Sequence, residues 1–155
     1  MHRSLFWSAV AASLLLAAGT ASAADIATPE QAKAMLDRAI AALKADEKAA
    51  LKAFNDEKDK RFHDRDLYVF CFDLPGGNFT AYQSPLLLGT PVRELTLPPN
   101  DPVGQRAYDA VANAPEETVV TVDFEFPKPG TKQLAPKQSI EARVGNQGCG
   151  VSYFK

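Results

Sequence analysis

Two cysteines carry the clearest chemistry in this sequence. Cys71 and Cys149 both lie in strand-like segments, and neither belongs to a CxxC or CxxCH arrangement. In an exported protein, an even pair of cysteines is most simply a disulfide bond. The alternatives are a redox site or half of a metal site, but the sequence places no second ligand near either cysteine. We therefore predict a disulfide between Cys71 and Cys149.

The usual catalytic combinations of residues do not occur in the chain. It holds two histidines, and His63 is the only one beyond the N-terminal segment. A serine or cysteine nucleophile needs a base such as histidine beside it, and there is no G-x-S-x-G elbow, P-loop or dinucleotide fingerprint. We expect His63, next to Asp64 and Asp66, to be an ordinary surface residue, because two carboxylates are too few for a calcium site. The sequence predicts no enzyme, no cofactor and no metal site.

A group of aromatic residues with one lysine is the candidate for ligand binding. Small-molecule sites are concave and mostly apolar, with a few polar groups that converge on the ligand. Aromatic residues on strands often only pack in the core, and lysines are mostly solvated, so plain packing is the alternative. The candidates for lining a pocket are Tyr68, Phe70, Tyr82, Phe124 and Phe126, with Lys137 as the charge that meets an anionic ligand.

The N-terminus predicts a secretory signal peptide. Arg3 is followed by an apolar run over residues 5–18 and by small residues that end in an A-x-A site at Ala23. A membrane anchor would need roughly 20 apolar residues, and Gly19 interrupts this run. We expect residues 1–23 to be cleaved after export to the periplasm. Residues 24–155 would then form one domain with no membrane insertion.

Charge excludes one class of partner. The formal net charge of the full sequence is −2. A protein that binds nucleic acid or an anionic membrane surface needs a basic face to replace phosphate counterions. We therefore expect no nucleic-acid partner.

A long helix is expected to begin at Thr28. Thr28 is a good N-cap, Pro29 suits the first helical position, and Gln31 completes a capping box. A second helical piece follows Asp46, so the segment is either one bent helix or two short ones. The charged run over residues 58–66 is expected to be a solvated helix end and loop. The apolar stripe of the first helix consists of Ala32, Met35, Leu36, Ala39, Ile40 and Leu43.

From Leu67 onward the sequence predicts strands. The run over residues 67–72 is apolar on both faces, which indicates a central strand. The proline-rich segment 84–102 is expected to be an extended crossing loop, and Asp101 and Pro102 suit the start of a short helix. The fold class is α+β, with the long N-terminal helix packed on a five-stranded antiparallel sheet. The other four strands are expected at residues 79–83, 119–126, 138–144 and 150–154.

Alternation along the strands assigns residues to the two faces of this sheet. If the last strand returns beside the first, Cys71 and Cys149 become neighbours and must share a face. The helix covers one face, and the other face is free to form a pocket under the crossing loop. Val69, Asp73, Val151 and Tyr153 are expected on the cysteine face, and Tyr68, Phe70 and Phe72 on the opposite face.

Five segments of the chain occur in an order and at a spacing that point to a known family. They are RDLYVFCFDLPGG (65–77), SPLLLGTPVREL (84–95), VDFEFPKPGT (122–131), APKQS (135–139) and GVSYFK (150–155). Together they resemble the single Cache domain, an extracytoplasmic sensor module for small ligands. The resemblance covers nearly all of residues 24–155, including the leading helix. It implies a PAS-like antiparallel sheet and a pocket for small organic ligands, often carboxylates, in bacterial signal transduction.

The chain departs from the family pattern at several pocket positions. Tyr82 stands where the family commonly has histidine, and Ser84 and Pro85 replace an Asn-Pro pair. Phe124 replaces the usual tyrosine, and Phe126 the usual tryptophan. These changes make the expected pocket less polar, which weakens the case for a carboxylate ligand.

Two hypotheses of function follow. Because the chain ends at Lys155, directly after the last expected strand, we expect a free-standing periplasmic Cache-type protein. It would bind a small organic metabolite and act with a separate membrane receptor or kinase. The alternative is a protein interaction module that keeps the fold but fills the pocket. An open cavity of about 300 Å3 or more is typical of a ligand site, so cavity size helps to separate the two hypotheses.

Overall fold

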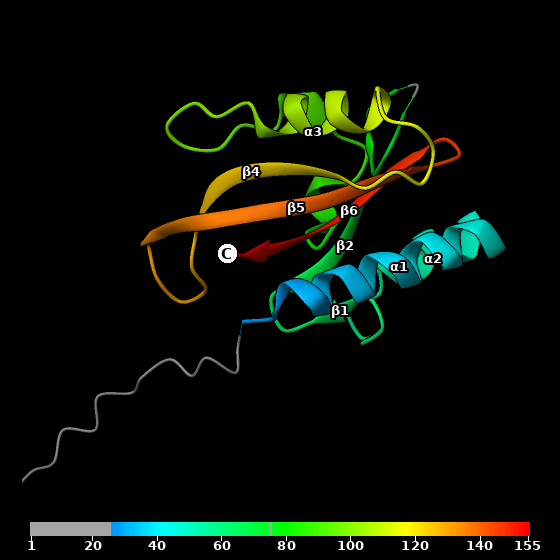
Figure 1. Ribbon diagram of the computed structural model, residues 1–155, viewed down its shortest axis with the longest axis horizontal. Helices are drawn as coiled ribbons and strands as arrows, with labels where there is room; N and C mark the ends of the chain where they lie inside the picture. The colour runs from blue at the N-terminus through cyan, green and yellow to red at the C-terminus, as the bar shows by residue number, and fades with distance from the viewer. Residues whose placement is uncertain (1–25, 75) are drawn as a thin grey trace, which may run out of the picture.

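A single antiparallel sheet with helices on both faces is the framework of the protein. The computed structural model describes residues 26–74 and 76–155, so the expected signal peptide lies outside the described residues. Helices α1 and α2 cover one face of the sheet, and α3 covers the other (Figure 1). In chain order the elements are α1 (Pro29–Ala45), α2 (Glu47–Phe54), β1 (His63–Asp64), β2 (Leu67–Asp73), β3 (Phe79–Ala81), α3 (Val103–Ala112), β4 (Val120–Pro127), β5 (Leu134–Val144) and β6 (Gln147–Phe154).

The leading helical segment forms as the sequence predicts. The backbone N–H of Thr28 donates to the side-chain oxygen of Gln31 at 2.8 Å, and the Thr28 hydroxyl oxygen accepts from the Gln31 N–H at 3.3 Å. At Asp46 the backbone becomes extended, and the Asp46 carboxylate accepts from the Ala49 N–H and begins α2. The segment is therefore two helices. The apolar stripe buries Ala32, Met35, Leu36, Ala39 and Leu43 against the sheet.

The sheet of the described residues contains six strands, one more than expected. Its order is β1-β2-β6-β5-β4, with β3 paired to β2 near the end of that strand. All pairs are antiparallel. Strand β5 begins earlier than predicted, at Leu134, because β4 pairs with it as far as Pro127. Strand β6 begins earlier, at Gln147, because a two-residue turn at Gly145 and Asn146 is enough to join it to β5. Gly145 supplies the positive φ of 58° that this turn requires.

The expectation of a solvated loop at His63 was wrong. His63 is 8% exposed, and its Nε2 lies 2.6 Å from the backbone oxygen of Phe54. The last carbonyl groups of a helix have no partner within the helix, and the imidazole N–H satisfies this one at the end of α2. Burial of the adjacent Phe62 against the Phe54 ring holds the segment in place, and it then forms the short strand β1.

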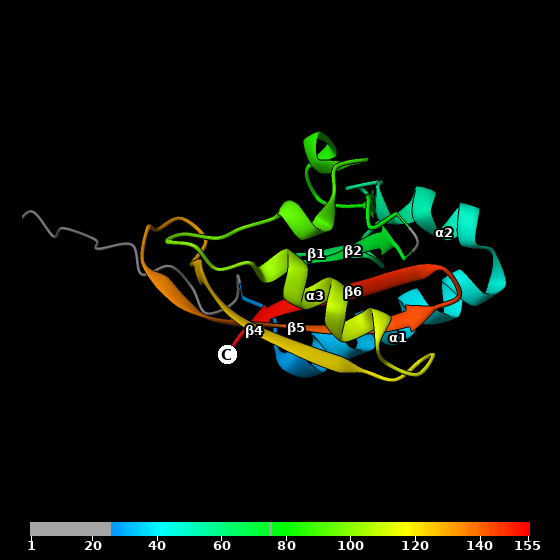
Figure 2. The same ribbon diagram turned by 90° about the horizontal axis from the view of Figure 1, so that it is seen from above.

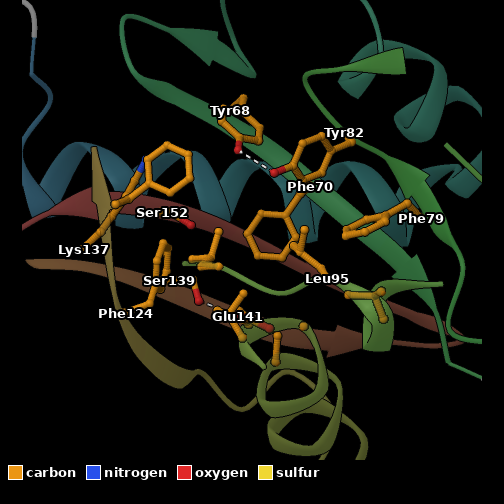
Figure 3. A pocket seen from close by; sticks show the side chains of 16 residues that line it. Tyr68, Phe70, Phe79, Tyr82, Leu95, Phe124, Lys137, Ser139, Glu141 and Ser152 are labelled. Carbon is orange, nitrogen blue, oxygen red and sulfur yellow. Dashed lines mark hydrogen bonds between the residues drawn. The ribbon is translucent and has the colours of Figure 1, made fainter. Parts of the chain in front are cut away.

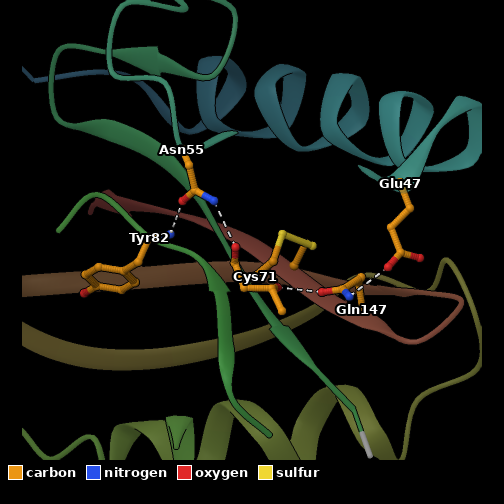
Figure 4. The surroundings of a disulfide bond; sticks show 7 residues. Glu47, Asn55, Cys71, Tyr82 and Gln147 are labelled. Atoms are coloured by element: carbon orange, nitrogen blue, oxygen red, sulfur yellow. Dashed lines mark hydrogen bonds between the residues drawn. A yellow bond between two sulfur atoms is a disulfide. The ribbon is translucent and has the colours of Figure 1, made fainter. Parts of the chain in front are cut away.

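The predicted disulfide joins the two strands at the centre of the sheet. Cys71 on β2 is the direct partner of Cys149 on β6, with their Cα atoms 4.1 Å apart (Figure 4). Val69 and Val151 pack with both cysteines against α1, whereas Phe70 and Phe72 belong to the cluster on the opposite face. The predicted pairing and the predicted division of faces are both confirmed.

Within residues 26–74 and 76–155, none of the helices has the length and apolar character needed to cross a bilayer.

We predict that replacing both Cys71 and Cys149 by alanine lowers the free energy of unfolding by on the order of 4 kcal/mol. The bond closes a loop across a sequence separation of 78 residues, and its loss restores the conformational entropy of that loop to the unfolded chain. Urea unfolding of the wild type, the double variant and the reduced wild type measures the effect. Equal midpoints for the oxidised wild type and the double variant would contradict the prediction.

Candidate ligand-binding site

Two glycines on β6 create the floor of the site. A Cβ atom on Gly150 would lie 2.6 Å from the Phe70 ring and 2.7 Å from Cγ of Glu141, which are its cross-strand neighbours on either side. A Cβ atom on Gly148 would lie 2.6 Å from the Phe72 ring. Because β6 has no side chain at these two positions, groups from β2 and β5 can lie across it.

The roof of the site consists of the crossing loop and α3 (Figure 2). A Cβ atom on Gly104 would lie 1.8 Å from the backbone oxygen of Val92, so α3 rests directly on the short 3-10 turn Val92–Glu94. Arg106 on α3 pairs with Asp101 at 2.7 Å and donates to the backbone oxygen of Asp123 on β4 at 2.9 Å. The sequence suggests that Asp101 caps α3, but its side chain makes no capping hydrogen bond. Asp101 instead ties α3 to the loop through Arg106.

All six residues proposed for the pocket line one cavity between this floor and roof. The cavity has a volume of about 70 Å3. Four of the six, Tyr68, Tyr82, Phe126 and Lys137, also line an outer hollow of about 800 Å3. The inner cavity and this surface hollow therefore lie next to each other. The predicted residues are Tyr68 and Phe70 on β2, Tyr82 after β3, Phe124 and Phe126 on β4, and Lys137 on β5 (Figure 3).

Tyr68 and Tyr82 form a hydrogen-bonded pair where the cavity meets the hollow. The Tyr68 hydroxyl donates to the Tyr82 hydroxyl at 3.2 Å. Asn55, directly after α2, accepts from the Tyr82 N–H at 3.2 Å and fixes the backbone at this point (Figure 4). Burial, and then the neighbouring Tyr82, raise the pKa of Tyr68 well above its usual value. Tyr68 therefore stays a neutral hydroxyl group at physiological pH.

Lys137 brings a positive charge to the site. The residue is 6% exposed, and its ammonium group lies 4.6 Å from the centre of the Phe154 ring and 5.1 Å from that of Phe126. Burial lowers the pKa of Lys137, while the nearby Asp66 acts in the opposite direction. No ion pair found among the described residues includes this lysine. Ring faces are weak partners for a buried cation, so the charge is left available to an anion.

Ser139 and Glu141 are polar residues of the cavity that sequence reasoning missed. They follow Lys137 on the same face of β5, and Glu141 is completely buried. The Ser139 hydroxyl donates to Oε1 of Glu141, while Oε2 has no hydrogen-bond partner among the described residues. Burial raises the pKa of Glu141 from its ordinary value of 4.5 to about 7, against the effect of the Ser139 hydrogen bond. The alternation of polar residues at 137, 139 and 141 was a signal, but it is also typical of a strand face in water.

Several proteins of known structure share this fold. A methyl-accepting chemotaxis protein from Vibrio parahaemolyticus is similar in structure, with a TM-score of 0.61 and 19% identity over 81% of this chain and 86% of that one. The periplasmic sensor domain of a chemotaxis protein has a TM-score of 0.56, 21% identity, and coverage of 81% and 88%. A Cache chemosensory domain that recognises carboxylic acid has a TM-score of 0.55, 17% identity, and coverage of 81% and 86%.

These similarities establish the fold of the chain. It has the α+β, PAS-like Cache fold that the sequence resemblance implied. No protein-family model and no curated protein matches the sequence.

We predict that the Glu141 carboxyl makes the stability of the empty protein depend on pH. Between its ordinary pKa of 4.5 and its folded-state pKa of about 7, the folded protein holds a proton that the unfolded chain has released. The free energy of unfolding therefore falls as the pH rises through this window, by on the order of 3 kcal/mol.

Urea unfolding over this pH range, on the wild type and on Glu141→Gln, measures the effect. Glu125→Gln, which changes an exposed carboxyl on β4, is the control. The wild type and the control should lose stability relative to Glu141→Gln as the pH rises. Parallel curves for all three proteins would show that burial does not perturb Glu141.

Proposed function

We propose that this chain is a periplasmic sensor protein that binds a small organic molecule between its sheet and the roof formed by α3 and the crossing loop. The observation that carries the proposal is the cavity itself. It is mostly apolar, and the polar groups of Lys137, Ser139 and Glu141 converge on it from one strand. Such a combination is characteristic of small-molecule sites. The proposed action is binding without catalysis, as in the sensor domains that share the fold.

The ligand we propose carries an acidic group that meets Lys137. A buried charge is costly unless an opposite charge or hydrogen bonds compensate it. Lys137 has aromatic rings on two sides, and the Tyr68 and Tyr82 hydroxyls line the same part of the cavity and the hollow. An anionic group at this position would receive a charge-assisted hydrogen bond from the lysine. A Cache chemosensory domain with the same fold recognises carboxylic acid, which agrees with an acidic group on the proposed ligand.

The proposed signalling step needs a membrane partner. We expect the signal peptide at residues 1–23 to direct the chain to the periplasm, where it would act with a separate receptor or kinase. Two of the proteins with the same fold are chemotaxis proteins, which supports a role in signal transduction. The crossing loop is the part of the roof best placed to respond to a ligand, because Val92 contributes to the cavity wall and to the seat of α3.

One observation favours a protein interaction module as the second candidate. The inner cavity of about 70 Å3 is smaller than the 300 Å3 or more that is usual for a drug-sized ligand. The Phe70, Phe124 and Phe126 rings are part of the cavity wall. Under this hypothesis the purified protein binds no small molecule and its thermal unfolding is unchanged by any of them.

A ligand screen distinguishes the two functions. The mature protein is tested by thermal unfolding and titration calorimetry against small carboxylates, amines and amino acids. We expect at least one acidic compound to bind saturably. Replacing Lys137 by methionine keeps the apolar stem over the two rings but removes the charge, so the affinity should fall roughly 10- to 100-fold, as expected for loss of a charged hydrogen bond.

Lys128→Met is the matched control, because Lys128 is exposed in the turn after β4. It should bind like the wild type. Binding that is equally strong in Lys137→Met would remove the lysine from the site, and a flat response of the wild type across the screen would favour the interaction module.

A further inference from the structure

One glutamate of the cavity wall has a buried carboxyl oxygen that lacks a hydrogen-bond partner among the described residues. Glu141 is completely buried and lines the cavity, and its Oε2 forms no hydrogen bond with any described residue. Its cross-strand neighbours are Val120 on β4 and Gly150 on β6, whose side chains offer no donor. A buried polar group that is left unpaired destabilises the folded protein, because it has lost its hydrogen bonds with water. The site therefore favours an occupant that brings a hydrogen-bond donor to this oxygen.

No charged side chain of the described protein compensates Glu141. The residues of α3 that line the cavity are Val103, Gly104 and Ala107, which carry no charge. The Arg106 guanidinium is held by Asp101 and by a backbone oxygen of β4. Ser139 supplies the hydrogen bond to the other oxygen of Glu141. Among the residues that the structure describes, Glu141 is accordingly the one acidic group of the cavity wall.

Lys137 is too far along the strand to neutralise Glu141. The two residues are four positions apart on one face of β5, so their Cα atoms are separated by about 13 Å. Lys137 does not contribute to the pKa of Glu141, and its own nearest acidic influence is Asp66. Figure 3 shows the two side chains at separate places in the cavity wall, with Ser139 between them along the strand. One wall thus presents a cation and a carboxyl group that do not pair with each other.

We propose that the ligand is a small zwitterion, which places its acid group at Lys137 and its ammonium group at Oε2 of Glu141. This inference rests on the proposed function, because it concerns the same cavity. A short carbon chain between the two ligand charges would contact the apolar rings that line the same cavity. The ammonium group supplies the missing donor and the missing opposite charge in one step.

At a pH above about 7, where Glu141 is ionised, this arrangement selects against simple acids. A monocarboxylate satisfies Lys137 but leaves Oε2 of Glu141 unpaired. A diacid brings a second negative charge towards the buried carboxyl, which is unfavourable where few waters are present to screen it. Only a ligand with both charges compensates both groups.

The pairing makes zwitterion binding depend on pH. Since the pKa of Glu141 in the empty protein is about 7, the carboxyl must lose its proton before it can pair with an ammonium group. Affinity should then be roughly tenfold weaker at a pH of about 6 than at a pH of about 8. The other ionisable groups of the cavity wall are Lys137, Tyr68 and Tyr82. A simple acid does not pair with Glu141, so the pH dependence of its binding reports on these three groups alone.

Calorimetry with matched pairs of compounds tests the proposal. The probes are β-alanine and γ-aminobutyrate, compared with propionate and butyrate, which have the same carbon chains without the ammonium group. We expect each zwitterion to bind at least about tenfold more tightly than its acid at a pH of about 8. Glu141→Gln should remove this advantage and the pH dependence, while Glu125→Gln, at an exposed position on β4, should keep both.

The outcomes separate the inference from the proposed function. If propionate or butyrate binds and the zwitterions bind no more tightly, the inference is overturned and the proposed function stands. A zwitterion that binds equally well to Glu141→Gln also overturns it, because Glu141 is then not the partner. If none of these compounds binds and the wider screen is flat as well, both proposals fail. Circular dichroism and thermal unfolding of each variant establish that it is folded.

Discussion

The pairing of β2 with β6 is the contact on which the rest of the molecule depends. Over residues 148–150, the two faces of β6 serve different parts of the molecule. Cys149 bonds to Cys71 on the side of α1, while Gly148 and Gly150 leave the other side open for the Phe70 and Phe72 rings. The disulfide fixes the register of the two strands, and a shift of one residue would exchange the faces. The helix-covered core and the cavity are therefore set by the same short segment.

The polar side chains on the cavity face of β5 are unfavourable to bury and lower the stability of the fold. Lys137, Ser139 and Glu141 are all nearly or completely buried, and only Ser139 and one oxygen of Glu141 are joined by a hydrogen bond. An apolar strand at this position would cost less free energy. Groups that are buried and left without compensation are common at functional sites, where a ligand completes them. The stabilising disulfide and the large core under α1 and α2 offset this cost elsewhere in the molecule.

The sequence was sufficient for features that depend on local periodicity. The capping box at Thr28, the apolar stripe of α1 and the two faces of β2 follow from neighbouring residues, and the disulfide follows once the strand order is assumed. Sequence reasoning failed at His63, because its partner is a helix carbonyl that only the folded chain brings near. It also missed Glu141, because alternation shows which residues share a face but not whether water or a roof lies over that face. The six aromatic and lysine candidates do line one cavity, whereas their contact with a ligand stays a prediction.

The departures from the Cache pattern explain where the polarity of this cavity lies. The family pattern has histidine, tyrosine and tryptophan where this chain has Tyr82, Phe124 and Phe126. At the two phenylalanine positions the side chain therefore has no hydrogen-bonding group. The Tyr82 hydroxyl accepts from Tyr68 and faces the mouth of the cavity. The remaining polar groups come mainly from β5, whose backbone is held by strands on both sides. Groups on a strand that is paired on both sides are held at a fixed spacing. The spacing of these polar groups therefore depends on β5 and its two neighbouring strands. The described residues of the crossing loop that line the cavity, Val92, Leu95 and Leu97, are all apolar.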